Sequence, residues 1–145
     1  MTGYRRKARE LALQALYYLD INHIGPADEI LQDALTLFYT HYPPSEQFKA
    51  FFGTLINGVL ENREKIDTLI EKHSRNWKIS RMSCVDRNIL RLAAFELLYC
   101  DDIPVKVTIN EAIDVSKKYG TKESGAFVNG IIDGIRKVYE SRSQP

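Results

Sequence analysis

The sequence predicts an all-α protein. Apolar residues recur every three or four positions along most of the 145-residue chain, which is the spacing of one face of a helix. Segments containing Gly or Pro separate these stretches at intervals suited to helix ends. The run with strand character, residues 105–109, follows Pro104 in a helical context, so an isolated strand is not expected there.

Two helices are expected first. One spans about residues 3–22, and a second spans about 26–41 after Gly25-Pro26. Tyr17 points away from the apolar face of the first helix on a helical wheel. That face is formed by Ala8, Leu11, Ala12, Ala15, Leu16 and Leu19.

A long periodic segment follows Pro43-Pro44 and covers about residues 45–73. Gly53 and Gly58 lie inside it, where they either admit a close neighbour or kink the helix. Residues 74–82 then break the period. We therefore expect a single domain with two subdomains, residues 1–76 and 77–145, and we expect Trp77 to pack at their junction.

The C-terminal part is expected to contain three further helices. The first, about 83–100, is the most apolar, and Ser83 followed by Asp86 three residues later indicates an N-terminal cap. The second, about 107–119, is expected to end at Gly120 as a C′ residue. The third spans about 122–140.

Positive charge is concentrated at the N-terminus. The net charge is only +1, yet residues 1–9 carry +4, from Arg5, Arg6, Lys7 and Arg9. A helix N-terminus is an unfavourable place for cations, because it already carries partial positive charge. The cluster is therefore either a frayed, solvated end or a site for a polyanion such as RNA.

Catalytic and metal-binding patterns are not found. The three histidines fit no zinc spacing, and neither a phosphate loop nor a supported nucleophile is present, so no enzyme, metal or cofactor is expected. Cys84 and Cys100 match no redox pair, which favours buried, reduced thiols in a cytoplasmic protein. The chain lacks a signal-type segment and any long apolar run, so no membrane association is expected.

A second basic region surrounds one expected corner between helices. Lys117, Lys118 and Lys122 alternate there with Tyr119 and Phe127. A phosphate suits such a corner, and an exposed aromatic ring suits an unstacked base. Periodicity alone, however, favours both rings as core residues.

Four ordered stretches resemble the NusB family of transcription antitermination factors. They are residues 6–17 (RKARELALQALY), 85–97 (VDRNILRLAAFEL), 103–112 (IPVKVTINEA), and 117–120 (KKYG) with 127–133 (FVNGIID). The resemblance implies an all-helical fold of two packed three- to four-helix subdomains. It also implies binding of boxA-type single-stranded RNA of ribosomal RNA leaders, together with NusE, a small-subunit ribosomal protein, to act on RNA polymerase against premature termination.

The resemblance also implies roles for particular residues. Contacts to RNA fall on the four N-terminal cations and on Phe127, with Glu123 on the same side. Lys118 and Lys122, from the basic corner, are added to this set. The surface for NusE includes Tyr17 and Asp86, and the same surface could support a homodimer.

Two other functions remain open from the sequence. One is an accessory RNA-binding domain like that of ribosomal RNA cytosine methyltransferases, which the same helical module resembles. The other is a helical scaffold for protein interactions, which requires an inert basic cluster.

Overall fold

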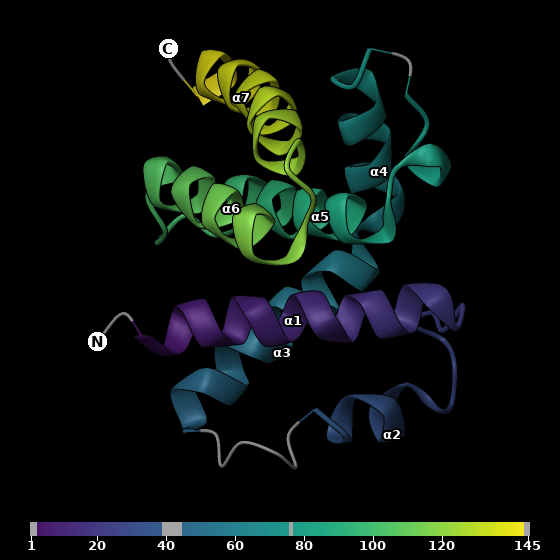
Figure 1. The fold of residues 1–145 in the computed structure, drawn as a ribbon. Coiled ribbons are helices and arrows are strands. Elements are labelled where there is room, and N and C mark those ends of the chain that lie inside the picture. Colours follow the sequence, from purple (N-terminus) through teal and green to yellow (C-terminus); the bar gives the residue numbers. More distant parts are fainter. Residues whose placement is uncertain (1–2, 39–44, 76, 144–145) are drawn as a thin grey trace. The chain divides into compact units, whose positions relative to one another are not determined.

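A computed structural model describes residues 3–38, 45–75 and 77–143 of the chain, with side chains described up to residue 140. All the regular secondary structure in these ranges is helical, which confirms the predicted all-α class (Figure 1). The elements are α1 (Gly3–Ile21), α2 (Leu31–Thr36), α3 (Glu46–Glu61), α4 (Arg63–Lys72), the 3₁₀ turn η1 (Ile79–Arg81), α5 (Cys84–Tyr99), α6 (Val105–Tyr119) and α7 (Ser124–Ser143).

Contacts divide the chain into two compact units, Met1–Glu61 and Asn62–Pro145, called here the N-terminal and C-terminal units. The division lies earlier in the chain than the boundary expected after residue 76. The reason is that α4 packs on α5 and α7 and therefore belongs with the later helices.

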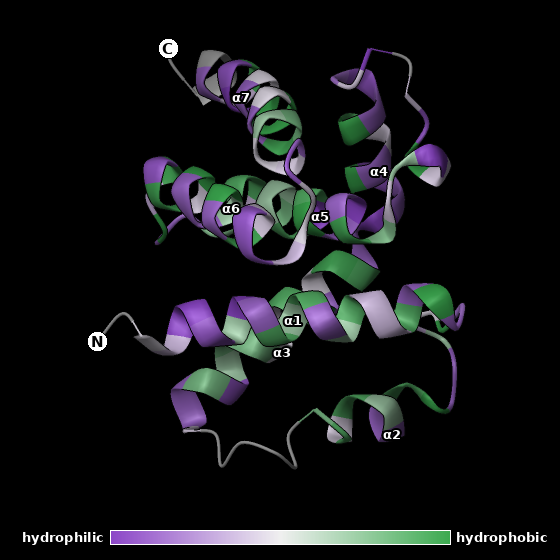
Figure 2. Cartoon of the chain, viewed as in Figure 1, coloured by the Kyte–Doolittle hydropathy of each residue, from purple (hydrophilic) through white to green (hydrophobic). Residues whose placement is uncertain are grey.

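In the N-terminal unit, α1 packs against α3. Hydrophobic and hydrophilic residues alternate along α1, as expected of a helix with one buried face (Figure 2). Its buried residues include Leu11 and Leu16, and those of α3 include Phe52, Leu55 and Ile56. This shared apolar core fixes which residues of α1 face outward.

The end of α1 differs from the expected one. His23, and not Gly25-Pro26, ends the helix in the left-handed region, with a φ of 55°. The Ile24 N–H then donates to the Leu19 carbonyl at 2.9 Å, and the His23 N–H donates to the Asp20 carbonyl at 3.2 Å. This pair of bonds is a Schellman motif, and the buried Ile24 and Leu19 side chains supply its apolar residues.

The second and third expected helices also need correction. The helix expected over 26–41 is shorter, since α2 covers only Leu31–Thr36, and Pro43-Pro44 lies outside the described residues. The segment expected over 45–73 is two helices that divide at Asn62. Gly53 and Gly58 lie within the continuous α3, so neither of them interrupts it.

In the C-terminal unit, α5 packs against α4, α6 and α7. Its predicted cap is confirmed, because the Ser83 hydroxyl accepts a hydrogen bond from the Asp86 N–H at 3.0 Å. Helix α6 begins directly after Pro104, so the run 105–109 is helical. The helical context of residues 105–109 therefore outweighs their strand propensity.

Gly120 directly follows the end of α6, as expected, and its φ of −95° lies outside the left-handed region that is common at a C′ residue. The glycine is required by close approach. A methyl group at this position would stand 2.6 Å from the Ser124 Cβ and 2.8 Å from the Ser116 carbonyl oxygen. Gly120 therefore allows α7 to start tightly against the end of α6.

Candidate nucleic-acid interface

The N-terminal basic cluster lies on the first turns of α1, which is helical from Gly3 onward. The guanidinium carbons of Arg5 and Arg9 lie 5.2 and 5.3 Å from the centre of the Phe51 ring on α3. These are cation–π distances. Arg9 is only 4% exposed, whereas Lys7 is exposed. The expectation of a frayed end does not describe these residues, because two of the cations are held against α3.

Phe51 is a residue of this site that the sequence does not predict. The ring is half-buried beneath two arginines that a helical wheel places beside the core. No acidic residue lies in the first turn of α1. The partial positive charge of the helix N-terminus and the charges of the cations therefore reinforce one another. The resulting positive potential suits a phosphate backbone.

Two tyrosines of α1 lie on its outer surface. Tyr17 is 41% exposed, in keeping with its outward direction on the helical wheel. Tyr18 is also exposed, and its ring packs edge-on against Phe38, with the ring centres 6.0 Å apart. Tyr17 is therefore accessible to a protein partner.

Asp86 lies in the first turn of α5, where a carboxylate interacts favourably with the helix dipole. Its Oδ1 atom is buried and has no hydrogen-bond partner among the described residues. An unpaired buried acceptor is costly. Because this atom is buried, it is not itself open to a partner, although the Asp86 side chain as a whole is half-buried.

A pocket of about 480 Å³ lies at the corner between α6 and α7. Lys117 and Lys122 line it, together with Thr121 and Asn129. Lys118, which the sequence favours for RNA, is exposed but is not among the lining residues. The structure thus brings Lys122 together with Lys117 at the pocket.

Other candidate residues of this corner have contacts of their own. Lys118 Nζ lies 5.4 Å from the centre of the Tyr119 ring. The Thr121 hydroxyl donates to Glu123 Oε2 at 3.3 Å, so Glu123 is turned toward the loop that precedes α7. The backbone N–H of Thr121 donates to the Ser124 hydroxyl at 2.9 Å, which caps the start of the helix.

Phe127 is half-buried, and its ring meets the ring of Trp77 edge-on, with centres 6.4 Å apart and planes inclined at 66°. Trp77 is 55% exposed. The expected packing of Trp77 is therefore partial, because this contact leaves much of the indole open to solvent. The pairing links residues far apart in the sequence and could not be read from periodicity.

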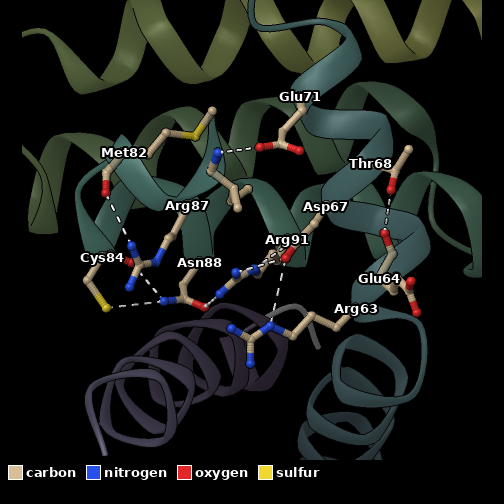
Figure 3. A network of polar contacts seen from close by, with 11 residues as sticks. Arg63, Glu64, Asp67, Thr68, Glu71, Met82, Cys84, Arg87, Asn88 and Arg91 are labelled. Atoms are coloured by element: carbon tan, nitrogen blue, oxygen red, sulfur yellow. Dashed lines mark hydrogen bonds and ion pairs between the residues drawn. The ribbon is translucent and has the colours of Figure 1, made fainter. Parts of the chain in front are cut away.

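A polar network ties α4 to α5 and to the η1 segment (Figure 3). The buried Arg91 donates from Nε and Nη2 to the two carboxylate oxygens of Asp67, at 2.8 and 3.0 Å, and from Nη1 to Asn88 at 3.1 Å. Glu71 accepts a hydrogen bond from the Ile79 N–H at 2.8 Å. These bonds fix the segment that carries Trp77 relative to α4.

Two cations of α7, Arg136 and Lys137, are already paired. Arg136 donates to Asp133 at 2.7 Å and to Glu140 at 2.8 Å, and Lys137 Nζ lies 3.4 Å from Asp133. The hydrogen bond from Arg136 is the main reason why the pKa of Asp133 is lowered. These residues are consequently poor candidates for phosphate contacts.

Two further properties concern the described ranges alone. No helix there combines the length and apolar composition needed to cross a membrane. In the same part of the chain, no three His, Cys, Asp or Glu side chains gather closely enough to hold a metal ion.

Comparisons with known proteins show which family this chain resembles over most of its length. A family model described as the NusB family matches residues 6–137. The transcription antitermination protein NusB of Desulfatibacillum aliphaticivorans is 53% identical and aligns over 92% of this chain and 90% of its own length. The structure of T. maritima NusB is 41% identical, has a TM-score of 0.83 and covers 92% of this chain and 90% of that one.

A further similar structure is that of the antitermination factors NusB and NusE in complex with double-stranded RNA. The matched chain is 29% identical and has a TM-score of 0.80, with coverage of 96% of this chain and 100% of that one. All of these likenesses extend over at least nine-tenths of both chains.

Proposed function

Because this chain belongs to the NusB family of transcription antitermination proteins, we propose that it binds boxA-type single-stranded RNA of ribosomal RNA leaders together with NusE. The complex then acts on RNA polymerase to suppress premature termination. The family consists of RNA-binding factors and not of enzymes. This role also assigns the chain to the cytoplasm, where transcripts are made.

The observation that carries the proposal is the basic cluster held on α1. Arg5 and Arg9 are fixed over Phe51, and Lys7, on the same turns of α1, is exposed. Cations held in this way lose little further side-chain entropy when a phosphate binds, which favours a specific contact. The RNA-binding set is Arg5, Arg6, Lys7, Arg9, Lys118, Lys122, Glu123 and Phe127, and the set for NusE is Tyr17 and Asp86.

The comparisons favour antitermination over the other two functions. The relatives are named as antitermination proteins, and the first of them is aligned over 90% of its own length. An accessory domain of a methyltransferase would be expected to match a small part of longer relatives. A pure scaffold would not require the concentration of cations at the start of α1.

The proposal is tested by RNA binding as a function of salt. We would replace Arg6 and Lys7 by Ala, which leaves the two arginines over Phe51 in place. Each phosphate contact contributes about −0.7 to the slope of log K against log salt for single strands, so the slope should become shallower by about 1.4. Fluorescence anisotropy of a labelled boxA-type oligonucleotide measures the affinity.

A matched control removes the same charge elsewhere. Lys65 and Lys106 are exposed lysines of the C-terminal unit that are not in the proposed RNA-binding set, and their replacement by Ala should leave the slope unchanged. If both double variants bind RNA like the unaltered chain, Arg6 and Lys7 do not contact phosphates. A double-stranded version of the same oligonucleotide tests the preference for single strands.

A further inference from the structure

The segment between α4 and α5 combines cations with an exposed aromatic ring. Arg75, Lys78 and Arg81 are all exposed, and their side chains form no hydrogen bond or ion pair with the described residues. Between residues 72 and 85 the sequence has no acidic residue. The family resemblance assigns no role to this segment, so its positive charge is unexplained.

The backbone at Trp77 is held in place by hydrogen bonds. The Trp77 N–H donates to the Ser74 carbonyl at 3.1 Å, and the buried Ser74 hydroxyl donates to the Trp77 carbonyl at 2.7 Å. The bond from the Ile79 N–H to Glu71 anchors the other side of Trp77 to α4. The exposure of the indole ring is therefore built into the fold.

We propose that this segment extends the RNA site, with Trp77 stacking on a base and with Lys78 and Arg81 contacting phosphates. The inference rests on the proposed function and adds a second aromatic surface beside Phe127. The two rings are 6.4 Å apart, so a strand that reaches Phe127 also reaches Trp77. Stacking on aromatic side chains combined with a basic surface is the usual means of binding single strands.

The angle between the rings favours a single strand over a duplex. The planes of Trp77 and Phe127 are inclined at 66°. Neighbouring bases in a duplex are parallel and could not stack on both rings at once. A single strand can turn its bases individually, and such splayed bases are the ones that proteins read in RNA.

The charge of the segment distinguishes RNA from a protein partner. Elsewhere in the same unit, Arg136 is neutralised by Asp133 and Glu140. The cations around Trp77 have no such partners among the described residues. Unpaired cations beside an open ring match the alternating phosphates and bases of a nucleic acid.

Trp77 is the only tryptophan of the chain, so its fluorescence reports directly on its surroundings. We would titrate the full chain with a labelled single-stranded boxA-type oligonucleotide, following anisotropy for binding and tryptophan emission for stacking. Stacking of a base should quench the emission along the same binding curve. Binding without quenching would overturn this inference alone, whereas no binding at all would contradict the proposed function as well.

Two variants test the energetic contribution. Trp77→Ala should weaken binding by roughly 5- to 150-fold, the range expected for loss of one stacked base. Tyr99→Ala is its control, because Tyr99 is likewise an exposed aromatic, at 40%, and should bind RNA normally. Circular dichroism confirms that each variant is folded. Equal affinities of the two variants would count against stacking on Trp77.

The phosphate contacts are tested separately. Replacing Lys78 and Arg81 by Ala should make the salt slope shallower by about 1.4, which the Lys65 and Lys106 double variant should not do. Arg75 is left unchanged, because its φ of 51° would make the effect of a substitution partly conformational. An unchanged slope would show that Lys78 and Arg81 do not contact phosphates.

Discussion

At the scale of single residues, one glycine sets how closely α7 approaches α4. A methyl group at Gly134 would stand 2.9 Å from Nδ1 of His73, whereas one at Gly130 would meet nothing within 4 Å. The pKa of His73 is below its usual value, mainly because the ring is partly buried and secondly because Lys72 is positively charged. The lowered pKa favours the neutral form of the ring that packs against Gly134.

These two glycines should respond oppositely to the same substitution. Gly130→Ala should raise the free energy of unfolding by about 0.5–1 kcal/mol, because alanine loses less backbone entropy in a helix. Gly134→Ala gains the same stabilisation from backbone entropy, but the new methyl group must displace His73. Overpacking of this kind costs about 1–3 kcal/mol, so this variant should be less stable than the unaltered chain. Urea unfolding measures both values, and equal stabilisation by both would show that α7 has room at residue 134.

At the scale of elements, the ion pair between Asp67 and Arg91 joins α4 to α5. The side chain of Arg91 is only 3% exposed, and both carboxylate oxygens of Asp67 accept its hydrogen bonds. A buried guanidinium that loses its carboxylate is strongly destabilising. Arg63 also approaches Asp67, at 3.8 Å, but its side chain is 40% exposed.

We therefore expect Asp67→Ala to lower the free energy of unfolding by about 3–5 kcal/mol. Arg63→Ala should cost less than about 1 kcal/mol, since solvent screens an exposed ion pair. Chemical unfolding followed by circular dichroism measures the difference. Similar losses in the two variants would mean that Arg91 finds other acceptors when Asp67 is removed.

The helix ends differ in how well the sequence predicts them. The start of α5 is predictable because Ser83 is itself the cap and its partner is three residues away. The break at Asn62 is not, because apolar residues continue at helical spacing on both sides of it. What separates α3 from α4 is their packing partners, α1 for one and α5 for the other, and these are distant in sequence.

The residues of the candidate site also differ in how well the sequence predicts them. The N-terminal cations could be found from charge alone, because four of them fall within residues 5–9 and no acidic residue lies among them. Phe51 and Trp77 could not be found, since their roles depend on rings and cations from other elements. A helical wheel gives the direction of a side chain but not the residue that covers it.

At the scale of the whole molecule, RNA and NusE should bind cooperatively. If both partners share one complex, NusE should strengthen RNA binding, and RNA should strengthen NusE binding by the same factor.

Tyr17→Ala should reduce this coupling without changing the thermal midpoint, because the side chain is 41% exposed. Tyr99→Ala, at 40% exposure, is the control. Anisotropy of labelled RNA with and without NusE measures the coupling, and a large loss of stability in Tyr17→Ala would make Tyr17 structural.

Each unit is a continuous piece of the chain, Met1–Glu61 followed by Asn62–Pro145. Helix α3 finds its partner α1 already synthesised, whereas α4 must wait for α5 and α7. Since compact units generally fold in the order in which they leave the ribosome, the unit with the N-terminal basic cluster can be complete while the C-terminal unit is still being translated. The division at Asn62 thus gives the nascent chain a natural point of separation between an early and a late folding step.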